Sequence, residues 1–153
     1  MNSKEKTIIF FATGGTVGNI PFAPGTFGTL VGLPLCFFLS LCHISFAAIF
    51  IIAFIVLAVW IAQEAEKLLK KKDPGCIVID EIAGIMVTLL GLPFDPLTVM
   101  AGFLIFRILD IFKPFPARML ERTIPGGAGV VLDDIAVGIW GNLILRIVLI
   151  FIP

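Results

Sequence analysis

The 153-residue sequence has little of what many catalytic sites require: one histidine, three cysteines and, from residue 7 to residue 63, no Asp, Glu, Lys or Arg. Cys36, Cys42 and Cys76 have no paired spacing, which argues against a disulfide framework and a zinc site. His43 falls in a predicted turn on the outer side, which does not support a Ser-His-Asp hydrolase or a histidine-dependent phosphatase. The net charge of zero argues against nucleic acid as a partner.

Apolar residues dominate instead, at 59 % of the sequence against 14 % charged, with a mean hydropathy of +1.11. This is more apolar surface than one small globular core can bury, so the lipid bilayer is the expected partner of an integral membrane protein. The apolar run of residues 7–12 is short and lacks the cleavage pattern of a signal peptide. We therefore expect the N-terminal segment to be retained.

The apolar runs predict an all-α fold, a single domain over residues 1–153 that forms a polytopic transmembrane bundle of about five spans. The predicted spans are residues 26–42, 46–61, 77–94, 97–112 and 132–151. The third and fourth are joined by a tight turn at residues 92–96, which indicates an antiparallel hairpin. Residues 10–24, rich in Gly and Pro, are predicted to be an interfacial or re-entrant segment.

Basic residues gather on one side of this arrangement, and only Arg146 lies away from it. They are Lys4, Lys6, Lys67, Lys70, Lys71, Lys72, Arg107, Lys113, Arg118 and Arg122. The positive-inside rule makes this side cytoplasmic, with the N-terminus inside and the C-terminus outside. Every acidic residue except Asp95 falls on the same side, so a site built from carboxylates is expected to face the cytoplasm.

Two acidic pairs occur in similar surroundings, Asp80-Glu81 within residues 77–83 and Asp133-Asp134 within residues 130–136. The similarity allows an internal duplication, but a match of seven residues can also arise by chance in so apolar a chain, which is the favoured explanation. Both pairs are predicted near helix N-termini, where one carboxylate could cap the helix and interact with its dipole. Capping needs only one acceptor, so the second carboxylate of each pair calls for another explanation.

Asp110 lies at the opposite kind of helix end, the C-terminal end of the fourth span, where the dipole disfavours a negative charge. A plain ion pair with Arg107 or Lys113 is one explanation. The other is metal binding, because carboxylates close to hydrocarbon repel one another and a hard divalent ion such as Mg²⁺ would neutralise them. The candidate catalytic and metal-binding residues are therefore Asp80, Glu81, Asp110, Asp133 and Asp134.

Cations near these carboxylates suggest chemistry on a phosphate. Arg107, Lys113 and Arg118 are candidates to bind phosphate oxygens, and Thr26 and Thr29 are candidate substrate-binding residues. The glycine-rich residues 125–129 could approach an anion, or could simply form a turn into the last helix. The threonines, likewise, could simply cap the first span instead of binding substrate. The sequence has neither the Cys-x5-Arg loop nor the Asp-x-Asp spacing of other phosphatases.

The chain resembles the phosphatidylglycerophosphatase A family, a bacterial membrane family. Four blocks carry the resemblance: PFAPGTFGT at 21–29, DPGCIVIDEIAG at 73–84, FRILDIFKPFP at 106–116 and GGAGVVLDD at 126–134. The resemblance implies a Mg²⁺-dependent phosphatase of the bacterial inner membrane that converts phosphatidylglycerophosphate to phosphatidylglycerol. It also implies that the five candidate carboxylates, with Arg107 and Lys113, are the family's motif residues.

Two other classes of function remain to be weighed. A small divalent-ion channel or transporter would place ionisable groups at several depths of the membrane. A structural membrane adaptor would leave the repeated acidic pairs unexplained. The sequence leaves open the general base, the number of metal ions, a covalent intermediate and the oligomeric state.

Overall fold

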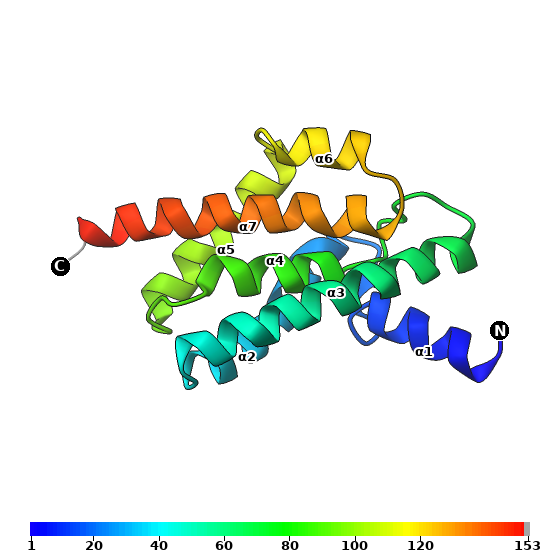
Figure 1. Ribbon diagram of the computed structural model, residues 1–153, viewed down its shortest axis with the longest axis horizontal. Helices are drawn as coiled ribbons and strands as arrows, with labels where there is room; N and C mark the ends of the chain where they lie inside the picture. Colours follow the sequence, from blue (N-terminus) through cyan, green and yellow to red (C-terminus); the bar gives the residue numbers. More distant parts are fainter. Residues whose placement is uncertain (152–153) are drawn as a thin grey trace.

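The protein is an all-helical bundle in the computed structural model, which describes residues 1–151 and has no strand in that range. Seven α-helices and a short 3-10 helix form it: α1 (Ser3–Ala12), η1 (Val17–Asn19), α2 (Pro24–Ser40), α3 (Ile44–Leu69), α4 (Ile79–Leu89), α5 (Pro96–Phe112), α6 (Ala117–Thr123) and α7 (Gly127–Ile150). The chain begins at one end of the long axis and α7 ends at the other (Figure 1). The predicted all-α class is confirmed.

Helix α4 lies at the centre of the bundle and packs against α2, α3, α5 and α7. Most residues of this helix, from Ile79 to Leu89, are buried. The buried side chains are largely apolar, apart from the region where the two carboxylates lie. The other long helices surround it (Figure 1). A helix buried on every side belongs to the core of the bundle, so its first turn is held by neighbours in all directions.

The predicted spans all coincide with helices, but the helices differ in length. Only α3 and α7, within residues 1–151, are long and apolar enough to cross a membrane. Helix α4 has 11 residues, or about 16 Å, against a hydrocarbon thickness of about 30 Å. The predicted 18-residue third span is therefore wrong in length. The helix ends at Leu89 because Leu90 adopts extended backbone and Gly91 has a φ of +68°.

The C-terminal end of α4 is held by two polar side chains of α7. Asn142 Nδ2 donates to the carbonyls of Thr88 (2.9 Å) and Leu90 (3.0 Å), and Arg146 Nη2 donates to the carbonyl of Leu90 (3.1 Å). Arg146 Nε also donates to Asn142 Oδ1 at 2.8 Å. The last carbonyls of a helix lack partners within the helix and carry a partial negative charge. Arg146, which lies away from the other cations, thus has a structural role.

Glycines let α4 and α7 approach closely. A Cβ on Gly138 would lie 2.6 Å from the carbonyl oxygen of Gly84, and one on Gly141 would lie 3.1 Å from the Thr88 side chain. These contacts advance together along both helices, so α4 and α7 run parallel. On its other side α4 meets α5 in reverse order, with Gly84 against Phe106 and Leu89 against Gly102. The predicted antiparallel hairpin is confirmed.

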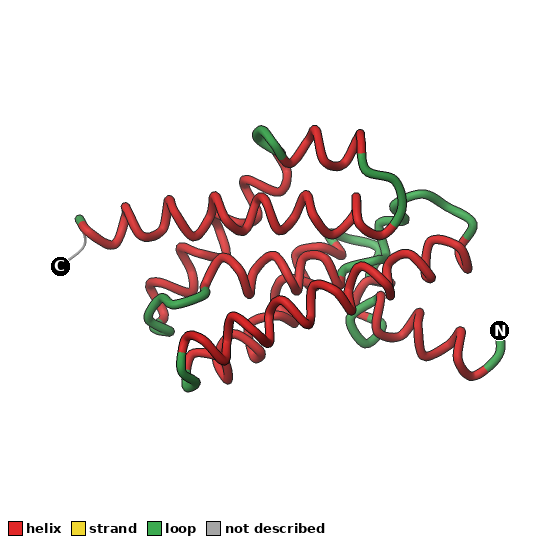
Figure 2. Tube along the Cα trace, viewed as in Figure 1, coloured by secondary structure: helices red, strands yellow, loops and turns green. Residues whose placement is uncertain are grey.

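The segment predicted to be interfacial or re-entrant, residues 10–24, contains the end of α1, a tight turn and η1. Ala12 accepts a hydrogen bond from the backbone N–H of Val78 at 2.9 Å. Gly18 packs against the carbonyl of Cys76 so closely that a Cβ would collide with it. The segment therefore supports the chain just before α4 begins, and the loops gather at the ends of the bundle and at the elbow between α5 and α6 (Figure 2).

The contact between Gly138 and Gly84 gives a test of this packing. Gly138→Ala should lower the free energy of unfolding by about 1–3 kcal/mol, because the added methyl group meets backbone that cannot move alone. The measurement is thermal or denaturant unfolding of the purified protein in detergent. Gly75→Ala is the matched control, since nothing lies within 4 Å of its Cβ position. Equal stability of the two variants would contradict the close approach of α4 and α7.

Candidate active site

Three carboxylates, two of them buried and one partly buried, meet where α4 and α7 are in contact. Asp80 and Glu81 lie in the first turn of α4, and Asp134 lies on α7; each offers one oxygen within 4.8 Å of the others. Asp80 is 8 % exposed and Asp134 is 2 % exposed. One oxygen of each side chain (Asp80 Oδ1, Glu81 Oε2 and Asp134 Oδ2) is buried with no hydrogen-bond partner in the described part of the chain. Each of the three grouped carboxylates thus has one buried oxygen without a donor.

The second acidic pair does not lie at a helix N-terminus, contrary to prediction. Helix α7 begins at Gly127, so Asp133 and Asp134 follow six and seven residues later, and no acidic residue occupies its first turn. Helix capping therefore explains neither of them. The start of α7 is earlier because Gly126, with a φ of +72°, turns the chain directly into the helix.

The glycine-rich residues 125–129 are not an open anion-binding loop. The backbone N–H of Gly127 donates to Gln63 Oε1 of α3 at 2.8 Å. A Cβ on Gly127 would collide with the backbone of Val59 and Gln63, and one on Gly129 would collide with the carbonyl of Ile124. Gly127 thus serves the contact between α7 and α3, and Gly129 the close turn between α6 and α7. No pattern in the sequence points to Gln63 as the partner of the Gly127 N–H group.

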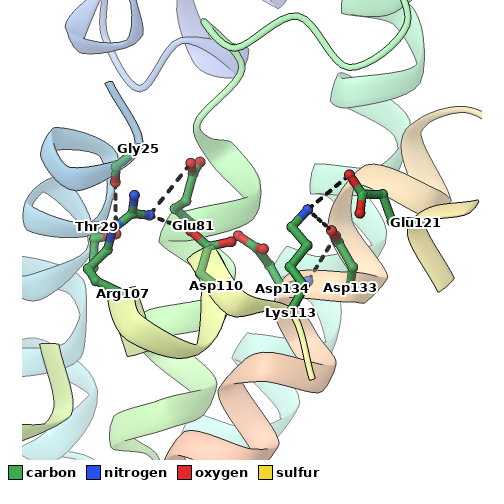
Figure 3. Close-up of polar contacts among 9 residues, drawn as sticks. All are labelled: Gly25, Thr29, Glu81, Arg107, Asp110, Lys113, Glu121, Asp133 and Asp134. Atoms are coloured by element: carbon green, nitrogen blue, oxygen red, sulfur yellow. Dashed lines mark hydrogen bonds and ion pairs between the residues drawn. The ribbon is translucent and has the colours of Figure 1, made fainter. Parts of the chain in front are cut away.

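Arg107 and Asp110 form an ion pair on one face of α5. Arg107 Nη1 lies 2.6 Å from Asp110 Oδ2 and 3.9 Å from Glu81 Oε1, with both partners of the shorter pair largely buried. The pairing that the spacing allowed is therefore present. Figure 3 also shows the carboxylate of Asp110 pointing toward that of Asp134. Asp110 thus lies between Arg107 and Asp134.

Lys113 pairs with Asp133 rather than with Asp110. Its backbone is left-handed (φ +45°), and its Nζ lies 2.6 Å from Asp133 Oδ2 and 3.3 Å from Glu121 Oε1 (Figure 3). Burial by itself lowers the pKa of an amine, but the hydrogen bond from Lys113 to Asp133 and the nearby negative charges outweigh it. The pKa of Lys113 is therefore raised, and this ammonium stays charged at neutral pH. Glu121 was missed because an acidic residue in a polar linker has no distinctive pattern.

The remaining predicted residues lie around this cluster without joining its ion pairs. Thr29 is fully buried, and its hydroxyl donates to the carbonyl of Gly25 at 2.8 Å, while Thr26 lies half-buried in the first turn of α2. Neither threonine caps α2, whose N-cap is Ala23. Arg118 Nη2 donates to the carbonyl of Phe112 at 2.8 Å. The structure therefore brings Arg107 and Lys113 to the carboxylates but not Arg118.

Gly25 is the residue of α2 that touches the cluster. A Cβ at this position would collide with Glu81 Oε1 and lie 3.0 Å from Arg107 Nη1. Only a glycine lets the start of α2 cover these two side chains. The sequence block that contains Gly25, Thr26 and Thr29 thus contributes a close backbone contact, which a search for polar side chains overlooks.

The arrangement suits a divalent cation. Asp80, Glu81 and Asp134 supply the oxygen ligands that hard cations such as Mg²⁺ or Mn²⁺ prefer, and each has a buried oxygen that lacks a hydrogen-bond partner. Arg107 and Lys113 stand on either side with donors suited to phosphate oxygens. An apolar helical bundle with an acidic site flanked by two cations is the design of a membrane-associated enzyme acting on a phosphate ester.

Comparison with known proteins names the family. The chain belongs to the phosphatidylglycerophosphatase A family, whose model matches residues 10–149. It is 36 % identical to phosphatidylglycerophosphatase A of Escherichia coli over 129 residues, which are 84 % of this chain and 75 % of that protein. It is 32 % identical to the Haemophilus influenzae protein of the same name, over 90 % of this chain and 86 % of that protein.

A further relative carries a different name. A Bacteroides thetaiotaomicron protein, provisionally named a phosphatidylinositol-3-phosphatase, is 32 % identical over 91 % of both chains. No solved structure matches the chain significantly. The named relatives are all lipid phosphatases, which agrees with the class that the fold and the acidic site define.

Cation binding can be tested without measuring catalysis. Saturating Mn²⁺ or Mg²⁺ should raise the thermal midpoint of the detergent-solubilised protein by about 5 °C, because a ligand that binds only the folded state stabilises it. Asp134→Asn should abolish this rise by removing one of the three grouped ligands. Asp95→Asn is the control, since Asp95 only caps α5 at the opposite end of the bundle. An undiminished rise in the Asp134 variant would contradict the site.

Proposed function

We propose that the chain hydrolyses the terminal phosphate of phosphatidylglycerophosphate in a Mg²⁺-dependent reaction, giving phosphatidylglycerol and inorganic phosphate. The observation that carries the proposal is the group of three carboxylates with unpartnered buried oxygens, Asp80, Glu81 and Asp134, in a chain of this family. The relatives named phosphatidylglycerophosphatase A supply the substrate. The buried carboxylate oxygens without partners are the reason for proposing a metal ion.

The enzyme is proposed to cross the bacterial inner membrane several times, with the site at the cytoplasmic face. Support comes from the arrangement of the bundle, since α1 begins, α3 ends and α7 begins at the same end (Figure 1). Most of the lysines lie in these segments and the loop after α3. By the positive-inside rule, the end that carries these lysines is the proposed cytoplasmic end. The helices α2 and α5 are shorter than α3 and α7. In the five-span topology they either cross a locally thinned bilayer or span it side by side with α4.

In this mechanism Asp80, Glu81 and Asp134 would hold the Mg²⁺ ion. When bound, the ion supplies positive charge that polarises the phosphorus–oxygen bonds and favours ionisation of water. Arg107 and Lys113 bind the phosphate oxygens as their negative charge redistributes in the transition state. Both cations stay charged and oriented because Asp110 holds Arg107 and Asp133 holds Lys113. Water attacks phosphorus and gives a proton to a carboxylate of the cluster, while the bond from phosphorus to the glycerol oxygen breaks. That oxygen takes up a proton and leaves as the terminal hydroxyl of phosphatidylglycerol, and the phosphate is released.

The channel alternative is weakened by the ionisable groups outside this cluster. Asp95 accepts hydrogen bonds from the backbone N–H groups of Leu97 and Thr98 at the start of α5. Arg146 is bonded to carbonyls at the end of α4. Both are engaged in ending or beginning helices, so within residues 1–151 no chain of free ionisable groups connects the two ends of the bundle.

Phosphate release from phosphatidylglycerophosphate in mixed micelles tests the proposal. The wild type should be active with Mg²⁺ and inactive with EDTA, and Asp80→Asn and Asp134→Asn should each lose about 100-fold or more in kcat/KM. Asp95→Asn should retain the wild-type rate. Phosphatidylinositol 3-phosphate, tested in parallel, should be a much poorer substrate. Full activity in both site variants, activity in EDTA, or preference for the inositol lipid would contradict the proposal.

A further inference from the structure

A basic hollow lies at the elbow between α5 and α6, beside the candidate active site. It has a volume of about 540 Å³, and its walls include Phe112, Lys113, Phe115, Arg118, Met119 and Arg122. Lys113 belongs both to this wall and to the acidic cluster, through its contact with Asp133. A ligand in the hollow would therefore be adjacent to a phosphate bound at the cluster.

Two arginines that line the hollow have positive charges that no carboxylate balances in the described part of the chain. Arg118 and Arg122 are four residues apart on α6 and so lie on one face of that helix. Arg118 uses Nη2 for the carbonyl of Phe112, and neither arginine forms an ion pair with a carboxylate anywhere in residues 1–151. Lys113, by contrast, is already neutralised by Asp133 and Glu121. The hollow therefore has an unbalanced positive charge.

The rim of the hollow is apolar and leads along a helix surface. Phe112 and Phe115 are among the most exposed large apolar side chains, at 69 % and 74 %. Exposed apolar residues continue from this rim along α5 at three- and four-residue spacing, through Ile111, Ile108 and Leu104. A positive pocket above a lipid-facing apolar stripe matches a ligand with a phosphate and acyl chains.

The elbow is fixed in place by contacts to its neighbours. Trp140 of α7 donates from Nε1 to the carbonyl of Phe115 at 3.0 Å, and Arg118 bonds to the carbonyl at the end of α5. The backbone of the hollow is thus tied to the same two helices that carry Asp110 and Asp134. Binding in the hollow would fix a ligand relative to the carboxylates.

We infer that Arg118 and Arg122 bind the diester phosphate of the lipid substrate, while its terminal phosphate meets the carboxylate cluster. The inference rests on the proposed function, since phosphatidylglycerophosphate has a terminal monoester phosphate and, one glycerol away, a diester phosphate. A lipid with the monoester alone, such as phosphatidic acid, leaves the two arginines without a partner. The hollow therefore selects between lipid phosphates.

The ratio of kcat/KM for phosphatidylglycerophosphate to that for phosphatidic acid measures this selection. Arg118→Gln and Arg122→Gln should each lower the ratio about tenfold, because each removes a charge-assisted hydrogen bond that only the first lipid can make. Lys71→Gln is the matched control, an exposed cation in the loop after α3, outside the walls of the hollow. The control should keep the wild-type ratio. An unchanged ratio in both arginine variants would overturn the inference.

Binding of short-chain phosphatidylglycerol separates this inference from the proposed function. That lipid has the diester phosphate and no monoester, so its affinity reports on the hollow even if no phosphate is released. Both arginine variants should bind it about tenfold more weakly than the wild type, with diacylglycerol of the same chain length, which has no phosphate, as the lipid control. Affinity equal to wild type would overturn the inference. Arginine-dependent binding in a wild type that does not hydrolyse phosphatidylglycerophosphate would instead overturn the proposed function.

Equal losses on phosphatidylglycerophosphate and phosphatidic acid form a separate outcome. They would mean that the arginines attract anionic lipid in general or support the fold, and would overturn the assignment to the diester phosphate. Thermal unfolding of the same variants distinguishes these two readings, because a folding defect lowers the midpoint whereas loss of a surface cation leaves it nearly unchanged.

Discussion

Three carboxylate oxygens, from Asp80, Glu81 and Asp134, lie buried without a donor where α4 meets α7. Buried charge without a partner is costly, and like charges in one space repel. The nearest cations offset only part of this charge, because Arg107 is shared between Asp110 and Glu81, and Lys113 pairs with Asp133. The cluster holds more negative charge than the chain can balance. The divalent cation that we propose would balance this charge, so it would support the fold as well as the chemistry.

The rest of the bundle brings these groups together. Helix α4 is short, buried and central, and Gly84 and Gly138 allow α7 to lie against it closely enough for carboxylates of both helices to meet. Asn142 and Arg146 secure its far end, and Gly25 lets the start of α2 cover Glu81 and Arg107. Because these contacts involve backbone at close range, small displacements of a helix would separate the ligands. Catalysis and packing therefore depend on the same glycines.

The sequence predicted the helical segments, the antiparallel turn into α5 and an acidic cluster near one end, because hydropathy and charge are local patterns. It misjudged the length of α4 and the start of α7, since a buried short helix and a glycine-rich first turn look like a span and a loop. It named Arg107 or Lys113 as the partner of Asp110 but could not choose between them, and it did not predict the partners of Lys113. Lys113 turns toward Asp133 through a left-handed backbone, and Glu121 joins from α6, contacts that only the tertiary arrangement creates.

The location of the bound cation tests this account most directly. Anomalous scattering from crystals of the protein grown with Mn²⁺ would place the ion independently of activity. The account predicts a peak between Asp80, Glu81 and Asp134, about 2.0–2.4 Å from an oxygen of each, with Arg107 and Lys113 outside the coordination sphere. A peak elsewhere, or none at saturating Mn²⁺ while these three side chains remain ordered, would contradict it.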